Sequence, residues 1–149
     1  MKLPNKSQII AWQHEPTVLR LMKENRWTKD TAQQWFNDFM KWMYTCQRYS
    51  SKTGKPFEMD DLHFLDEVWH AYILHTKAYF KMSKDLFDVE YLHHDPENPF
   101  GSGESIPDEV LLAQMNALVD DWGMEYVDRV WKYGADKHDL LVKYAVKIA

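Results

Sequence analysis

The sequence predicts an all-α protein, a compact bundle of five to six helices with one long irregular loop. Apolar residues recur at three- and four-residue steps through most of the chain, which is the period of a helix with one buried face. Glycine (five) and proline (six) are few and mostly separate these periodic segments. No segment shows the strict alternation of apolar and polar residues that is typical of a strand.

We expect the chain, residues 1–149, to form a single helical domain. The formal net charge of −5 argues against a dedicated nucleic-acid binder, which normally carries a basic face. No run approaches the roughly 18 apolar residues that span a bilayer, and the first residues lack a secretory signal pattern. These features predict a cytoplasmic protein without a membrane partner. The single cysteine, Cys46, excludes a disulfide within the chain and a Cys-rich zinc site.

The first helical segment, from about Ser7 to Asn25, is expected to form two shorter pieces. Asn5, with Gln8 three residues later, is typical of a capping box at a helix start. Pro16 lies inside the segment, where a proline removes a backbone hydrogen bond and clashes with the preceding turn. We therefore predict a break near Pro16.

The second helix has the clearest pattern and is expected to begin near Thr28 and Asp30 and to end before a loop at residues 50–56. Its apolar residues recur at helical spacing: Trp35, Phe36, Phe39, Met40, Trp42, Met43, Cys46 and Tyr49. A third helix is predicted from about Asp60 to Phe87 as one continuous element. We expect the second and third helices to pack as an antiparallel central pair.

The stretch between Tyr91 and Pro107 is the predicted irregular loop, because it holds three prolines and two glycines. Long loops in compact domains often carry function. Pro107 is typical of a helix start, and Gly123 and Gly134 of helix ends. The three helices predicted after the loop are Asp108–Trp122, Met124–Tyr133 and Asp136–Ile148.

A cluster of acidic and imidazole side chains lies beside the apolar stripe of the third helix. His63, Asp66, Glu67 and His70 fall within an arc of roughly 100° on the helix. Asp66 and His70 are four residues apart, so their side chains meet on one face. His75 falls away from this face, and His14 has no acidic companion, so neither histidine is given a role.

Three interpretations of this cluster remain open. A metal site would combine Asp66 and His70 with His93 or His94 from the following loop and leave positions for water. Metal-free acid–base chemistry would use Asp66 to orient His70 as a general base. A structural network would join Asp66 to His70 and to the Trp69 indole or a loop amide, tying the loop to the helix. The Asp-x-x-x-His spacing alone does not decide between them.

The residues around this cluster follow a recognisable order. That order is Asp66, Trp69-His70, Thr76, Tyr79 and then His93-His94-x-Pro96. It resembles the core of the glycine-rich domain-containing protein-like family, a largely uncharacterised family of bacteria and plants. The resemblance covers about 30 residues of the chain. It implies a polar site but no established reaction.

The chain also departs from that family's pattern at three positions. Tyr72 stands where the family usually has a second histidine, Ser83 stands near its cysteine, and Asp88 stands near its glycine. A family site that needs the histidine or the cysteine would therefore be reduced or altered in this chain.

The leading functional hypothesis is a small helical protein with a polar pocket at Asp66, His70, His93 and His94. This pocket is expected to hold a divalent metal, either zinc, iron or manganese. A more specific version of the hypothesis is that the bound metal supports a hydrolytic activity. The alternative is a protein-interaction module that contacts a protein partner through a Trp- and Met-rich surface or through the loop between Tyr91 and Pro107. In that case the Asp–His network is purely structural.

Overall fold

The computed structural model describes residues 2–57, 63–93 and 107–132 of the chain. Within these ranges it contains seven helices and no strand, which confirms the predicted all-α class. The helices are α1 (Lys6–Ala11), α2 (Glu15–Asn25), α3 (Lys29–Thr53), α4 (His63–Ile73), α5 (Thr76–Phe87), α6 (Asp108–Trp122) and α7 (Met124–Lys132). The predicted helix at Asp136–Ile148 lies outside the described residues. None of the described helices is long and apolar enough to cross a membrane.

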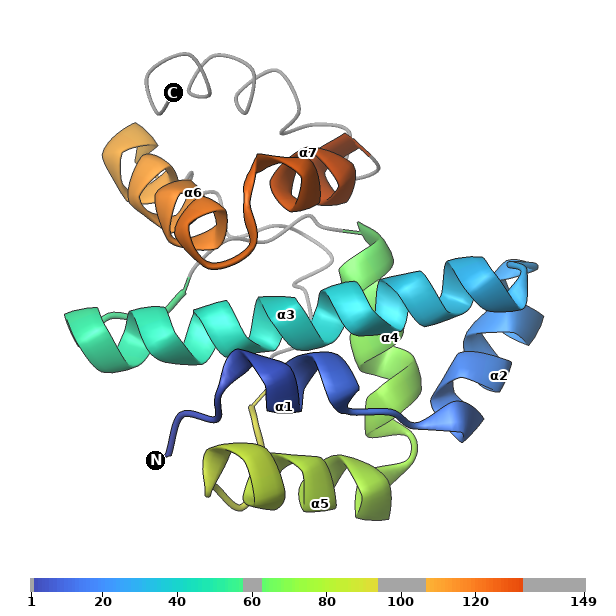
Figure 1. Ribbon diagram of the computed structural model, residues 1–149. Coiled ribbons are helices and arrows are strands. Elements are labelled where there is room, and N and C mark those ends of the chain that lie inside the picture. Colours follow the sequence, from blue (N-terminus) through green and yellow to red (C-terminus); the bar gives the residue numbers. More distant parts are fainter. Residues whose placement is uncertain (1, 58–62, 94–106, 133–149) are drawn as a thin grey trace, which may run out of the picture.

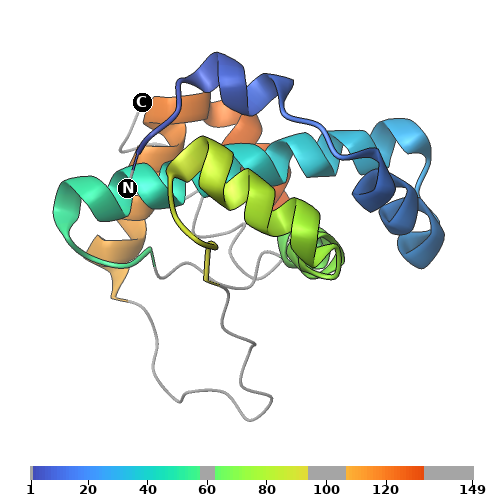
Figure 2. The ribbon, with the colours of Figure 1, turned by 90° about the horizontal axis from the view of Figure 1, so that it is seen from below.

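The long helix α3 lies at the centre of the molecule, with α6 and α7 on one side and α1 and α5 on the other (Figures 1 and 2). It begins after Thr28, whose side chain accepts a hydrogen bond from the N–H of Thr31, and ends at Gly54 with a positive φ of 70°. Because helices cover it from several directions, α3 is buried around most of its circumference. Its side chain Cys46 is buried, and burial raises the pKa of this thiol.

The core contains most of the large aromatic and methionine side chains in the described part of the chain. Trp35, Trp42 and Trp131 are at most 5% exposed. Met40, Met43, Met82 and Met115 are at most 1% exposed. These seven residues therefore do not contribute to the Trp- and Met-rich surface of the alternative hypothesis. Burying their apolar area against other helices stabilises the fold.

The first helical segment is broken as predicted. The Asn5 side chain accepts a hydrogen bond from the Gln8 N–H, and the Gln8 side chain accepts one from the Asn5 N–H. This capping box opens α1. Pro16 lies in the first turn of α2, where its missing N–H costs no helical hydrogen bond.

The predicted third helix is not continuous but breaks at Leu74 and His75 into α4 and α5. The His75 N–H donates to the carbonyl of Tyr72, only three residues earlier, at 2.9 Å. After this turn the ring of Tyr79 meets the ring of Tyr72 edge-on, with centroids 5.5 Å apart. The break lets α5 bury its own apolar face, so the tertiary contact overrides the helical pattern.

The expected antiparallel central pair is also wrong. In Figure 1 α4 runs steeply across α3, and in Figure 2 the same helix is seen nearly end-on. The aromatic rings at this crossing interlock, since Phe39 of α3 lies 5.7 Å from Trp69 and 6.3 Å from Tyr72 of α4. Bulky rings of this kind pack well at a steep crossing.

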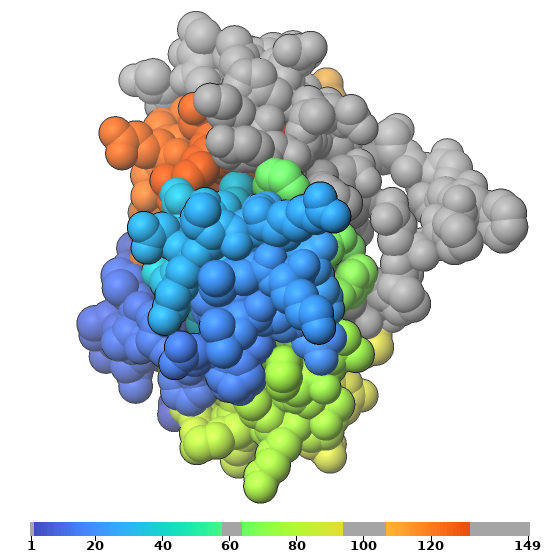
Figure 3. Space-filling model, turned by 90° about the vertical axis from the view of Figure 1, so that its right-hand side faces the viewer, coloured from blue at the N-terminus to red at the C-terminus, as the bar shows by residue number. Residues whose placement is uncertain are grey.

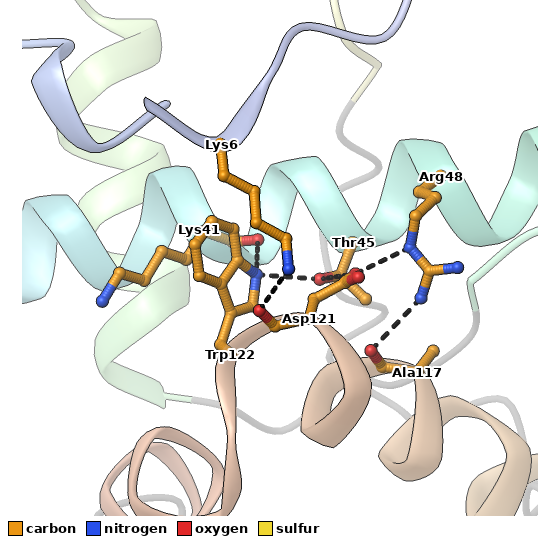
Figure 4. Close-up of polar contacts among 7 residues, drawn as sticks. All are labelled: Lys6, Lys41, Thr45, Arg48, Ala117, Asp121 and Trp122. Carbon is orange, nitrogen blue, oxygen red and sulfur yellow. Dashed lines mark hydrogen bonds and ion pairs between the residues drawn. The ribbon is translucent and has the colours of Figure 1, made fainter. Parts of the chain in front are cut away.

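A polar network joins α1, α3 and α6 (Figure 4). The Asp121 carboxylate accepts hydrogen bonds from the Thr45 hydroxyl and from Nε of Arg48, each at 2.8 Å. The Thr45 oxygen in turn accepts a hydrogen bond from the Trp122 indole at 3.0 Å. Lys6 of α1 donates to the backbone carbonyl of Asp121 at 2.8 Å. The network fixes the end of α6, just before Gly123 allows the chain to turn into α7.

A second polar tie connects α7 to α3. The side chain of Asp38 is 2% exposed, and its two oxygens accept hydrogen bonds from Nε and a terminal nitrogen of Arg129 at 2.9 and 2.8 Å. The hydroxyl of Tyr126 donates to the backbone carbonyl of Asp38 at 2.8 Å. This bidentate pair holds α7 in register on the central helix.

Candidate functional site

Asp66 and His70 lie together on α4, as their spacing predicts. Nε2 of His70 is 3.4 Å from Oδ2 of Asp66. The side chain of His70 is 53% exposed and that of Asp66 is 39% exposed. The pair therefore faces solvent, where an ion pair of this kind contributes little to stability.

Of the other two predicted ligands, only His93 lies within the described residues. His93 is exposed and lies beside the ring of Tyr91, with centroids 6.3 Å apart. His94 lies outside the described residues. Among residues 2–57, 63–93 and 107–132, no three His, Cys, Asp or Glu side chains come together as a set of metal ligands. The four-residue metal site stays a prediction.

A buried relay ties the segment after α5 to the two helices before it. The indole N–H of Trp69 donates to the Tyr79 hydroxyl at 2.9 Å, and this hydroxyl donates to the carbonyl of Leu92 at 2.6 Å. The Leu92 N–H donates to the Ser83 hydroxyl at 3.1 Å, and this hydroxyl donates to the carbonyl of Tyr79 at 3.0 Å. The motif residues Trp69 and Tyr79 thus have a structural role, with Tyr79 rather than Asp66 accepting from the indole.

Burial keeps the tyrosine hydroxyls of this region protonated, so they act as neutral hydrogen-bonding groups. It raises the pKa of Tyr79 to about 12, and the hydrogen bond from Trp69 lowers it only in part. Burial also raises the pKa of Tyr72 to about 12. The Tyr72 hydroxyl accepts a hydrogen bond from the indole N–H of Trp12 at 3.0 Å. Tyr72 is therefore a core residue of this chain.

Two histidines that we gave no role from the sequence lie side by side in the structure. The rings of His14 and His75 have centroids 5.2 Å apart and are inclined at 68°. His14 stacks on Tyr72 and shares a hydrogen bond of 2.7 Å with the Thr17 hydroxyl. The Nε of Arg20 donates to Nε2 of His75 at 3.4 Å. Local sequence patterns do not predict this pairing, because the two histidines are far apart in the sequence and the turn at His75 was not predicted.

The two histidines line an open cavity of about 510 Å³ at the start of α5. Its lining residues are His14, Leu74, His75, Thr76, Lys77, Ala78 and Lys81. No carboxylate is among them. Burial lowers the pKa of His14, and the positive charge of a protonated His75 lowers it further.

An exposed surface with apolar and basic side chains continues from this cavity along α5. We call it the α5 face, and it consists of Leu74, Lys77, Phe80, Lys81, Lys84 and Tyr91. Leu74 is 63% exposed, Phe80 47% and Tyr91 49%, and the last two rings stack with centroids 5.7 Å apart. In Figure 3 the yellow-green residues of this region form the lower end of the molecule, next to the blue N-terminal helices.

No family model, curated protein or solved structure matches the chain. The resemblance to the glycine-rich domain-containing protein-like family therefore stays a prediction.

Proposed function

We propose that the chain is a protein-interaction module that binds an acidic segment of a partner protein at the α5 face. One observation carries the proposal. Of the six large hydrophobic side chains exposed in the described part of the chain, Leu74, Phe80 and Tyr91 belong to this single surface. Exposed apolar side chains scattered singly are ordinary, whereas a cluster of them rimmed by polar groups is typical of an interaction site.

The charges of the α5 face favour an acidic partner. Lys77, Lys81 and Lys84 are exposed and fall on the same side of α5 as Phe80, because residues three and four apart are neighbours on a helix. They place three positively charged side chains beside Phe80 on a chain whose net charge is −5. A partner segment with acidic residues around an apolar anchor would complement both features.

Two of these lysines already form ion pairs within the chain, but both can still bind carboxylates of a partner. Lys81 pairs with Asp85, and Lys84 pairs with Asp88 at 2.7 Å. All four side chains are at least 40% exposed, so each pair is weak and exchanges readily with carboxylates of another chain. The stacked rings of Phe80 and Tyr91 supply the kind of aromatic surface that often dominates binding energy.

The buried relay also supports an interaction module over an enzyme. The relay explains the positions of Trp69 and Tyr79 by a structural role. This explanation assigns no catalytic role to the neighbouring pair Asp66 and His70. The second candidate function is a divalent-metal site formed by Asp66, His70 and His93 or His94. In its more specific version the metal supports hydrolysis. The 3.4 Å contact between Asp66 and His70 is the observation that supports it.

Fluorescence polarisation with two labelled peptides tests the interaction. One short peptide contains leucine flanked by glutamates, and the other has lysine in place of each glutamate. We expect the acidic peptide to bind at least about tenfold more tightly, and its affinity to fall as salt is added. Equal binding of the two peptides would refute the proposal.

Matched variants locate the binding surface. Phe80→Ala should weaken binding of the acidic peptide by about tenfold, since truncating an aromatic anchor at an interface costs more than about 1 kcal/mol. Leu19→Ala is the control, because Leu19 is 49% exposed but lies on α2. Lys84→Glu should weaken binding, and Lys52→Glu, at the end of α3, should not. Equal effects of Phe80→Ala and Leu19→Ala would place the peptide elsewhere.

A further inference from the structure

The cavity at the start of α5 has an unusual charge composition for an acidic chain. Four of its seven lining residues have basic side chains, namely His14, His75, Lys77 and Lys81, and none has a carboxylate. Leu74 and Ala78 add an apolar wall. The cavity is open to solvent, so an anionic group attached to a larger molecule can reach it.

Each of the two imidazoles of the cavity makes a hydrogen bond with a neighbouring side chain. His14 stacks on Tyr72 and bonds to Thr17, and both of these residues are at most 1% exposed. His75 accepts a hydrogen bond from Arg20 at Nε2, so Nδ1 carries the proton when the ring is neutral. Fixed donors of this kind bind a ligand without a large ordering cost.

The positive charges around the cavity are only partly balanced. Lys81 is paired with Asp85, and Arg20 with Glu24 at 2.9 Å. Lys77 makes no ion pair with any residue that the structure describes. The lowered pKa of His14 reflects repulsion from His75 as well as burial, and a bound anion would relieve this repulsion. A carboxylate offers two acceptor oxygens, whereas a phosphate monoester offers three to the Lys77 ammonium and the two imidazoles.

We propose that this cavity binds a phosphate monoester group, and that the group is a phosphorylated side chain of the partner segment. The source of the group rests on the proposed function, since the cavity shares Leu74, Lys77 and Lys81 with the α5 face. The phosphoryl oxygens accept hydrogen bonds from the Lys77 ammonium and the two imidazoles. The first turn of α5 adds the partial positive charge of its backbone N–H groups. Phosphorylation then strengthens an interaction that the apolar and basic surface makes weakly by itself.

The test compares the acidic peptide with the same peptide carrying one phosphoserine, using the full chain and fluorescence polarisation. We expect the phosphorylated peptide to bind at least about tenfold more tightly. Lys77→Ala and His75→Gln should reduce this advantage to about threefold or less, and Lys52→Ala should retain it. Phe80→Ala should weaken both peptides equally and leave their ratio unchanged. Circular dichroism of each variant checks that it keeps its helices.

Inorganic phosphate distinguishes a peptide-borne group from a free one. When it is added to the protein, the NMR signals of His14 and His75 should shift and the pKa of His14 should rise. These shifts without any gain for the phosphopeptide would support the phosphate site but assign it to a small-molecule phosphate. If both peptides bind equally and inorganic phosphate shifts neither histidine, the phosphate site is refuted while the interaction module stands. If no peptide binds and the histidines still shift, the interaction module fails and the phosphate site remains.

Discussion

The indole N–H of Trp69 donates a hydrogen bond to the hydroxyl of Tyr79 at 2.9 Å. The same hydroxyl donates to the carbonyl of Leu92 at 2.6 Å, so one oxygen atom joins α4, α5 and the segment that follows α5. The segment carries Tyr91 of the α5 face. The position of Tyr91 on the proposed binding surface therefore depends on hydrogen bonds to the buried Tyr79 hydroxyl.

We expect Tyr79→Phe to lower the free energy of unfolding by about 1–3 kcal/mol, because it removes the hydrogen bonds that the Tyr79 hydroxyl makes to the Trp69 indole and the Leu92 carbonyl. Urea denaturation measures this loss. Tyr44→Phe is the matched control, since Tyr44 is 8% exposed and its hydroxyl makes no hydrogen bond to a described residue. A loss of the same size in the control would show that the hydroxyl relay contributes nothing special.

Arg129→Ala should destabilise the protein by about 3 kcal/mol, since it leaves the buried Asp38 carboxylate without its cation. The double variant Asp38→Asn/Arg129→Met should recover part of this loss, because it removes the uncompensated charge. Chemical denaturation of the two variants and the parent chain gives the comparison. If Arg129→Ala unfolds at the same denaturant concentration as the parent, the ion pair does not hold α7 on α3.

His14 predicts a pH dependence of stability with a definite sign. Its pKa in the folded chain lies below the ordinary value of 6.5, so the unfolded chain binds more protons around that pH. The contribution of neutral His14 to stability is therefore present above about pH 6.5 and is lost as the pH falls through the folded pKa. His14→Gln should remove this component, so its pH profile of unfolding should be flatter between about pH 8 and pH 5. Parallel profiles of the two proteins would contradict the prediction.

His70→Ala should change the free energy of unfolding by less than about 0.5 kcal/mol, because its contact with Asp66 is exposed. Elemental analysis of protein purified without a histidine tag provides the second readout. Near-stoichiometric zinc, iron or manganese that disappears in His70→Ala would favour the metal site over the interaction module. Metal-free protein whose melting temperature ignores chelators would leave the second candidate without support.

Local signals in the sequence predict much of the fold. The capping box at Asn5, the proline at position 16, the cap at Thr28 and the glycine at position 123 all mark helix boundaries found in the structure. Each of these signals acts within one or two turns of chain, so sequence alone reveals it. The contact between Asp66 and His70 was predictable for the same reason, since both residues lie on one helix.

The break at Leu74 and His75 was not predictable in this way, because no glycine or proline marks it. It depends on the packing of Tyr79 against Tyr72, a contact that forms only when α5 folds back. The cavity with His14 and His75 depends in turn on that break. A site formed by segments that are far apart in the chain has no local sequence periodicity from which it could be predicted.

The burial of Cys46 makes the only sulfhydryl of the chain a natural reporter of unfolding. A thiol reagent needs both access and thiolate character, and the folded chain withholds both. The rate of labelling with such a reagent therefore measures how often the C-terminal half of α3 becomes accessible, with no probe engineered into the protein. A partner that binds the α5 face should slow this labelling, because it stabilises the closed state by mass action.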